Sequence, residues 1–508
     1  MLRIKVGGTL RRTANGEIRN YAKGDIIDSA KEVITQARDI LFGKAIPHPE
    51  REIPLSLACI EFLPGEGPNP LSPSTTGEAK KMKYQGQFGF DFFRKKNSVY
   101  TDEKSFFDSL PLDTQTGYFS ENGVFKQYKT AKEQYEALCK EYKKHPITYR
   151  PKKEIKDGWE SEEWLYYIPY LTLYSKEYVE SLTSEYKPVY EAYLSLSVEI
   201  EKDIDQWKFE YDTSLFKHSL EIPLETKKCQ PTKHGCNLKI TCLKDFDREQ
   251  EIRVYAYPKG SKGKHELEQE SMKELAGVIK VLPNSANYRK KVNVLAVQLQ
   301  TDVNDTNGKE VQRGKFYKDQ IQRFHHLFNQ AYIEPELEFY KTKDGEKFLD
   351  LTKDPRFKKN TSYIDGEGNI IWKYNNTLRN SGEKYLESFL PEDKKGHLII
   401  YIFNLKCKKD EETDILGDSV LNSKRCFIYQ DLTFKDNLPF FHAHANTPVH
   451  EAMHGLGLAH TFYSDSYKNH GKYAKFFLNQ GSTGNLMDYS RDAYFLYKWQ
   501  WDLIRQEI

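Results

Sequence analysis

The segment that decides the fold of the C-terminal third reads His450-Glu451-Ala452-Met453-His454-Gly455-Leu456-Gly457-Leu458-Ala459-His460. His450 and His454 are four residues apart, so on a helix their side chains project from one face and can hold one metal ion. Gly457 can adopt a left-handed backbone conformation at low cost, which ends the helix and lets the chain turn back. His460 can then reach the same ion. The spacing therefore predicts a metal site built by one helix and the bend that follows it.

The neighbouring residues extend this prediction. Thr447 and Pro448 form a helix-start signal, with Thr447 as the N-cap and Pro448 at the first helical position. Three neutral imidazoles leave a fourth coordination position open, which is typical of a single catalytic Zn²⁺ rather than a structural one. Glu451 follows the first predicted ligand directly and is predicted to act as a general base toward water. The competing interpretation is a helix whose histidines only form hydrogen bonds.

A second element reads Asn485-Leu486-Met487-Asp488-Tyr489-Ser490, and its Met487 lies 27 residues beyond His460. With this element, the sequence resembles the metzincin family of zinc metalloproteases, in which a tight turn carries a Met beneath the metal. The resemblance covers roughly residues 445–490. It implies a metalloendopeptidase in which Met487 is the Met of that turn and supports the ligands by packing. It also implies that Tyr489 donates a hydrogen bond to the oxyanion.

The layout of the whole chain is similar to that of Bacteroidota proteins associated with type VI secretion. The similar features are a Gly-Phe-Asp-Phe stretch (89–92), a β-sandwich, and a metalloprotease that ends in Trp-Gln-Trp-Asp (499–502). This similarity implies a secreted bacterial effector or toxin with secretion-apparatus proteins among its partners, beside a protein or peptide substrate.

Upstream of the histidines, length and patterning predict a multidomain α+β protein, because 508 residues exceed what one core usually organises. Residues 1–110 are predicted to form a mixed α/β module that contains a capped amphipathic helix at 30–42. Residues 111–185 are a helical or irregular connector. Alternating apolar residues in 186–285 predict an immunoglobulin-like all-β sandwich. Strands and helices alternate in 286–508, which predicts an α/β metzincin-like catalytic domain.

Composition narrows the choice of partners and compartments. The chain has 76 basic and 74 acidic residues, a balance that argues against a nucleic-acid partner. No apolar run approaches the roughly 18 residues of a membrane span. The first residues lack the apolar stretch of a secretory signal, so we expect synthesis in the cytoplasm and export, if any, by a non-Sec system. The seven cysteines are scattered and expected to be free, with Cys229–Cys236 and Cys407–Cys426 disulfides as alternatives.

Two other functions stay open at this point. Zinc chemistry hydrolyses any amide, so the protein could be an amidase acting on cell-wall peptides. More than half of the chain lies outside the catalytic pattern, so it could also be a secretion-apparatus or binding protein with a structural zinc site. The intact Glu451 counts against that alternative, because a structural site needs no base. His442, His444 and His470 are expected to be solvated, and the pair His325-His326 to be structural.

Overall fold

A computed structural model describes residues 57–68, 81–93, 117–119, 125–149, 164–301, 313–353, 362–364, 370–373, 383–404, 407–408, 414–430, 441–462, 475–478, 480–481, 483–489 and 493–508. All of these residues belong to one compact unit that spans 55–508. The helix predicted at 30–42 lies outside the described residues.

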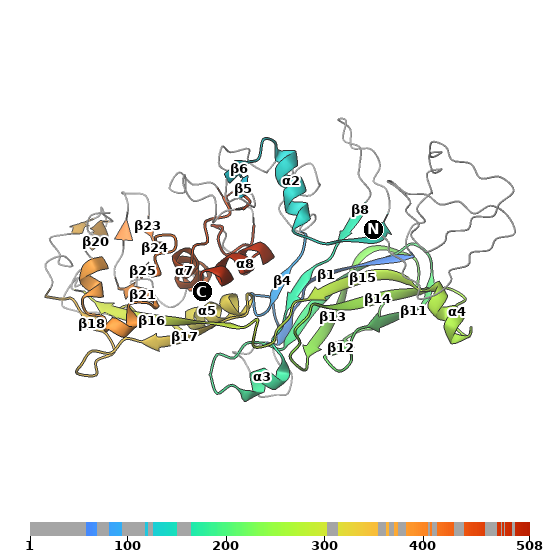
Figure 1. The fold of residues 1–508 in the computed structure, drawn as a ribbon, viewed down its shortest axis with the longest axis horizontal. Coiled ribbons are helices and arrows are strands. Elements are labelled where there is room, and N and C mark those ends of the chain that lie inside the picture. The colour runs from blue at the N-terminus through green and yellow to red at the C-terminus, as the bar shows by residue number, and fades with distance from the viewer. Residues whose placement is uncertain are drawn as a thin grey trace, which may run out of the picture. The chain divides into compact units, whose positions relative to one another are not determined.

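Two sheets are formed by the chain before residue 282 (Figure 1). One has the order β1-β10-β13-β12 and the other the order β11-β14-β15-β9-β4. All neighbours pair antiparallel except β15 and β9, which are parallel. The bounds are β1 Ala58–Pro64, β4 Gly89–Asp91, β9 Tyr170–Thr172, β10 Glu191–Ile200, β11 Ile204–Glu210, β12 Phe216–Leu220, β13 Cys229–Cys242, β14 Gln250–Pro258 and β15 Glu274–Val281.

The two sheets share one hydrophobic core, to which alternate residues of their strands contribute. Leu194, Leu196 and Val198 of β10 are fully buried and alternate with partly exposed residues, as the pattern predicts. The sheets nevertheless draw on more of the chain than 186–285, because β1, β4 and β9 are hydrogen-bonded into them. Strands as short as β4 and β9 have too few residues to show an alternation. The immunoglobulin-like connectivity stays a prediction.

A third sheet, with the order β17-β16-β21-β25-β24, occupies the C-terminal half. β16, β17, β21 and β25 are parallel, β24 pairs antiparallel at one edge, and β18 pairs with β16. All six residues of β21 are buried, because separate apolar clusters cover the two faces of the sheet. The bounds are β16 Lys290–Gln300, β17 Ile333–Phe339, β18 Leu349–Asp350, β21 Leu398–Phe403, β24 Gly417–Ser419 and β25 Arg425–Tyr429.

Three helices pack on one face of this sheet: α5 (Lys318–Asn329), α7 (Phe441–Gly455) and α8 (Lys498–Gln506). They share a single apolar cluster, in which Phe324 of α5, Met453 of α7 and Trp501 of α8 are almost fully buried. α7 contacts β21, β25 and β24, so it lies against the antiparallel edge of the sheet (Figure 1).

The remaining described elements are small. They are the strands β2 Gly67–Pro68, β3 Lys81–Met82, β5 Gly117–Phe119, β6 Phe125–Gln127, β7 Lys144–Tyr149, β8 Trp164–Tyr167, β19 Ser362–Ile364, β20 Ile370–Lys373, β22 Cys407–Lys408 and β23 Asp414–Ile415, and the helices α2 Ala131–Lys140, α3 Lys176–Ser181, α4 Glu266–Met272 and the 3₁₀-helix Glu392–Lys394. None of the helices in the described ranges is long and apolar enough to cross a bilayer.

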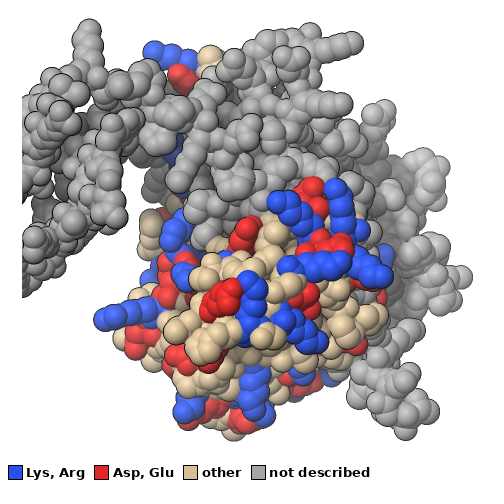
Figure 2. All heavy atoms as spheres, turned by 90° about the vertical axis from the view of Figure 1, so that its right-hand side faces the viewer, with Lys and Arg blue, Asp and Glu red and all other residues tan. Residues whose placement is uncertain are grey.

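Six of the seven cysteines have described side chains, and none of these six forms a disulfide bond: Cys59, Cys139, Cys229, Cys242, Cys407 and Cys426. The two alternative disulfides, Cys407–Cys426 and Cys229–Cys236, are therefore not formed. Cys236 is part of β13, but its side chain is not described. On the face drawn in Figure 2, basic and acidic side chains are interspersed over the described part. An ion pair between Lys208 and Glu270 (2.7 Å) joins β11 and α4.

We expect acid to destabilise the fold through α5. Burial lowers the pKa of His325 to about 4, so between pH 6.5 and 4 the unfolded chain binds a proton that the folded chain does not. The stability contributed by the neutral ring is present above pH 6.5 and lost as pH falls. His325→Phe keeps an aromatic ring against Tyr186, on which His325 stacks. Between pH 7 and pH 5, the free energy of unfolding of His325→Phe should fall by about 2 kcal/mol less than that of the unaltered protein, as measured by urea titration.

The control is His265→Gln, since His265 lies at the exposed start of α4. An equal loss of stability with pH in His325→Phe and the unaltered protein would contradict the assignment.

Candidate metal centre

Helix α7 carries His450 and His454, as the spacing predicts, but it begins at Phe441 rather than at Pro448. Pro448 is consequently inside the helix, where it removes one backbone hydrogen bond. Tertiary contacts explain the extension. Asn446 is buried; it accepts a hydrogen bond from Arg323 of α5 (3.1 Å) and donates one to the carbonyl of Ala493 (2.7 Å). These contacts stabilise the helical conformation of the residues that precede Thr447 and Pro448.

The end of α7 follows the prediction. Gly457 has φ +94°, a conformation that glycine adopts at little cost. Its N–H donates to the carbonyl of His454 (2.8 Å), and the N–H of Leu458 donates to that of Met453 (2.9 Å). This pair of hydrogen bonds is a Schellman motif, which satisfies the last helical carbonyls and reverses the chain. The reversal brings His460 back to the two histidines of the helix.

The three predicted ligands converge on one point. The Nε2 atom of His454 lies 3.1 Å from that of His450 and 3.0 Å from that of His460, and the His450–His460 separation is 3.1 Å. A tetrahedral zinc ion with Zn–N bonds of about 2.0–2.1 Å places its nitrogens about 3.3 Å apart, so the triangle is slightly tight but of the right size. Among the described residues, this trio is the group of His, Cys, Asp or Glu side chains able to hold an ion.

The hydrogen bonds of the Nδ1 atoms show which tautomer two of the imidazoles adopt, and therefore whether their Nε2 atoms can bind a metal. Nδ1 of His450 lies 2.8 Å from the carbonyl of Leu486, and Nδ1 of His454 lies 2.6 Å from that of Leu458. A carbonyl only accepts, so both Nδ1 atoms carry the proton and both Nε2 atoms present a lone pair. Lone pairs aimed at each other across 3.1 Å repel unless a cation lies between them. The donor set therefore fits a zinc ion.

Burial keeps these imidazoles neutral. Desolvation lowers the pKa of His450, and the pKa values of His454 and His460 fall well below the usual value. Neighbouring imidazoles in the trio lower the latter two further, because a second positive charge there would be repelled. At neutral pH the three rings are thus uncharged, and His450 and His454, with Nδ1 protonated, have no proton to displace from Nε2.

Glu451 lies beside the trio, on α7 and against the edge strand β24. Glu451 is 8% exposed, so its carboxylate is largely shielded from bulk water. Gly417 of β24 leaves room for it: a Cβ atom at position 417 would lie 2.6 Å from Cγ and 2.8 Å from Oε1 of Glu451. Because glycine has no side chain, residue 417 leaves the space that the Glu451 carboxylate occupies.

Gly417→Ala tests this arrangement. The added Cβ would press on Glu451 and would also lie 2.8 Å from Cγ2 of Thr447, so both side chains must shift and the cost in stability should be about 1–3 kcal/mol. The displaced carboxylate should slow hydrolysis by about 10²-fold with zinc affinity retained, because misplacement of roughly 1 Å costs that much. Gly396→Ala is the matched control, since a Cβ there meets nothing within 4 Å. Unchanged turnover in Gly417→Ala would show that position 417 does not govern Glu451.

The turn that contains Met487 contacts the segments that carry the predicted ligands. Met487 is fully buried, in the same apolar cluster as Met453 of α7. Its carbonyl accepts the N–H of Thr461, the residue after the third histidine (3.0 Å). The carboxylate of Asp488 accepts hydrogen bonds from the N–H groups of Gly481 (2.6 Å) and Thr483 (2.8 Å) and closes the loop on itself. The turn thus contacts both segments that carry ligands.

Tyr489 lies against the imidazoles on the open side. Its ring centroid is 4.8 Å from that of His460, edge-on, and 5.9 Å from that of His450. The residue is 59% exposed, yet partial desolvation, followed by the carboxylates of Glu451 and Asp418, raises the pKa of its hydroxyl to about 12. The phenol therefore stays protonated at neutral pH and can donate a hydrogen bond.

The comparisons with known proteins add little to this geometry. No family model matches the chain, and no curated protein matches it. Archaemetzincin from Methanopyrus kandleri is one similar solved structure, with a TM-score of 0.23 and 11% identity, covering 44% of this chain and 97% of that one. At so low a TM-score the likeness carries no argument. The site rests on its own residues.

Sequence reasoning missed the groups that orient the ligands. The carbonyls of Leu486 and Leu458 and the bare backbone of Gly417 have no side-chain signature, although Leu458 belongs to the histidine segment itself. The side chains of His442 and His444 are not among those described, and His470 lies outside the described residues. Their predicted solvation stays untested.

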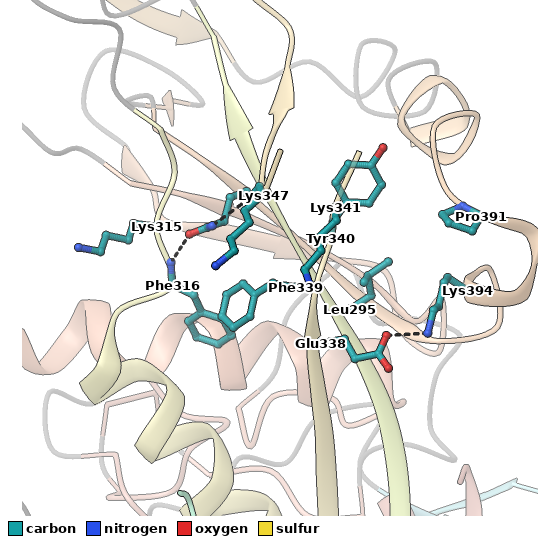
Figure 3. A pocket seen from close by; sticks show the side chains of 11 residues that line it. Leu295, Lys315, Phe316, Glu338, Phe339, Tyr340, Lys341, Lys347, Pro391 and Lys394 are labelled. Atoms are coloured by element: carbon teal, nitrogen blue, oxygen red, sulfur yellow. Dashed lines mark hydrogen bonds and ion pairs between the residues drawn. The ribbon is translucent and has the colours of Figure 1, made fainter. Parts of the chain in front are cut away.

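A cleft of about 740 Å³ lies on the same sheet but is not lined by the histidines. It surrounds the end of β17, where Figure 3 shows Lys394 turned toward Glu338 (2.6 Å). The rings of Phe316 and Phe339 lie 6.5 Å apart on its lining. β17 and β24 are at opposite edges of the sheet, so this cleft is separate from the metal centre.

Proposed function

We propose that the protein is a zinc-dependent endopeptidase with its active site at the histidine trio. One observation carries the proposal: three imidazoles, two of them with Nδ1 held by carbonyls, direct Nε2 atoms at a common point beside a shielded carboxylate. A zinc ion held by His450, His454 and His460 would supply a Lewis acid that lowers the pKa of water and polarises a carbonyl.

The protein's own groups perform the proton transfers. Glu451, as general base, takes a proton from the attacking water and delivers it to the leaving amine of the peptide. Tyr489, protonated at neutral pH, donates a hydrogen bond to the oxygen that becomes negatively charged in the tetrahedral intermediate. Met487 contributes packing beneath the ligands. Export as an effector, contact with secretion-apparatus proteins and the immunoglobulin-like nature of the sandwich stay predictions from the sequence.

The two alternatives are separated from this proposal by substrate assays. Zinc-loaded protein is incubated with casein and with peptidoglycan fragments, each with and without 1,10-phenanthroline. We expect casein fragments that vanish with the chelator and return when zinc is restored. Hydrolysis of the wall fragments alone would establish an amidase instead. Hydrolysis of neither, together with stable binding to a spike or tube protein, would establish a binding role.

A further inference from the structure

The turn formed by residues 485–489 links the candidate metal centre to a buried chain of hydrogen bonds. The carbonyl of Leu486 accepts from Nδ1 of His450 (2.8 Å). One residue later, the N–H of Met487 donates to Oδ1 of Asn485 (2.9 Å). The Asn485 side chain therefore closes the same turn whose carbonyl orients a predicted ligand.

Asn485 is in turn held by helix α8. Its Nδ2 donates to Oε1 of Gln500 (2.7 Å), and Nε2 of Gln500 donates back to Oδ1 of Asn485 (3.2 Å). Oε1 of Gln500 also accepts the N–H of Tyr497 (2.8 Å). Both amide side chains are fully buried. The backbone N–H donors fix which amide atom is oxygen, so the pair has one favourable orientation.

The chain of contacts continues into the sheets of the N-terminal half. Asp91 of β4 is 1% exposed, and its Oδ2 accepts the N–H of Lys498, the first residue of α8 (2.8 Å). The same oxygen accepts the hydroxyl of Tyr142 (2.9 Å). A carboxylate at this end of a helix is stabilising, because the first N–H groups lack helical partners. A strand 407 residues away in sequence thus holds the start of the helix that carries Gln500.

We propose that Gln500 is a positioning residue for His450, acting through Asn485 and the turn, with Asp91 fixing the helix from which it acts. The inference rests on the proposed metal site. Gln500 does not contact the trio itself. Its loss would loosen the turn, and the Leu486 carbonyl would no longer hold the proton on Nδ1 of His450. Partners of ligating histidines typically affect metal affinity by about 10–100-fold.

Gln500→Met tests the proposal, because methionine has a similar length but no amide. Zinc affinity is measured by competition with a chromophoric chelator, and site geometry by the absorption spectrum of the Co²⁺-substituted protein. We expect about 10-fold weaker zinc binding and a changed cobalt spectrum. Gln500→Glu keeps the acceptor for Tyr497 N–H and for Nδ2 of Asn485 but loses the donor to Oδ1 of Asn485, so it should recover only part of the affinity.

Asp502→Asn on the same helix is the matched control, since the side chain of Asp502 is 52% exposed and pairs with the amine of Lys498 rather than with Gln500 or Asn485. It should bind zinc as the unaltered protein does. A lower melting temperature of Gln500→Met with unchanged zinc affinity and cobalt spectrum would overturn the proposal and leave Gln500 a purely structural residue. Failure of the unaltered protein to bind zinc would instead overturn the proposed function.

A measurement on the unaltered protein covers the case in which Gln500→Met does not fold. Coupling between two sites is reciprocal, so zinc must stabilise the contacts that favour its binding. We expect zinc to slow hydrogen exchange, followed by mass spectrometry, in peptides covering 483–489 and 493–502 by roughly 10-fold. Slowing confined to the histidine segment, with no change in the peptide of α8, would overturn the proposal.

Discussion

Glu451→Gln is expected to lower the rate of peptide hydrolysis by about 10²–10⁴-fold while leaving zinc bound. Glutamine has nearly the shape of glutamate, so it fits the space that Gly417 leaves beside the helix. It cannot accept a proton from water, and that is the one property the proposed mechanism requires of residue 451. In this variant, turnover should therefore fall while zinc affinity stays unchanged.

The measurement pairs casein turnover with zinc content determined on the same sample. Glu392→Gln serves as the control, because Glu392 begins an exposed 3₁₀-helix and pairs only with surface Lys395 in the described structure. The control should retain full activity. Equal turnover by Glu451→Gln and the unaltered protein would refute the assignment of Glu451 as the base, whatever the zinc content shows.

His454→Ala is expected to abolish tight zinc binding and hydrolysis together. His454 is the most buried of the trio, at 3% exposure, and its Nε2 is within 3.1 Å of both other Nε2 atoms. Loss of a direct ligand should cost more than the roughly 10–100-fold that loss of an outer partner costs. The variant should be folded, because Leu458 and Gly457 still end the helix through backbone hydrogen bonds.

The effect is measurable without an assay of activity. Zinc at about 100 times its Kd should raise the free energy of unfolding of the unaltered protein by about 2.7 kcal/mol. The same concentration should leave the stability of His454→Ala nearly unchanged. His265→Ala, at the exposed start of α4, is the control and should respond to zinc normally. A full zinc response by His454→Ala would show that the ion binds elsewhere.

The histidine segment shows which structural features can be predicted from the local sequence alone. Residues four apart on a helix share a face whatever surrounds them, so His450 and His454 were predictable as a pair. Gly457 ends the helix for an equally local reason, the low cost of a positive φ. The start of the same helix was predicted wrongly, at Pro448 with Thr447 as the N-cap instead of at Phe441, because buried Asn446 is held by α5 and by Ala493 rather than by its neighbours in sequence.

By itself, the sequence determined the identities and spacing of the three imidazoles and of Glu451, because helix geometry converts spacing into direction over two turns. It also determined which strands show an apolar face, where they are long enough to alternate. Only the tertiary structure decided that Leu486 holds Nδ1 of His450, that Gly417 makes room for the carboxylate, and that Asp91 holds α8. Some of these contacts are made by backbone groups, and others join residues up to 407 positions apart. Contacts of both kinds leave no periodic pattern in the sequence.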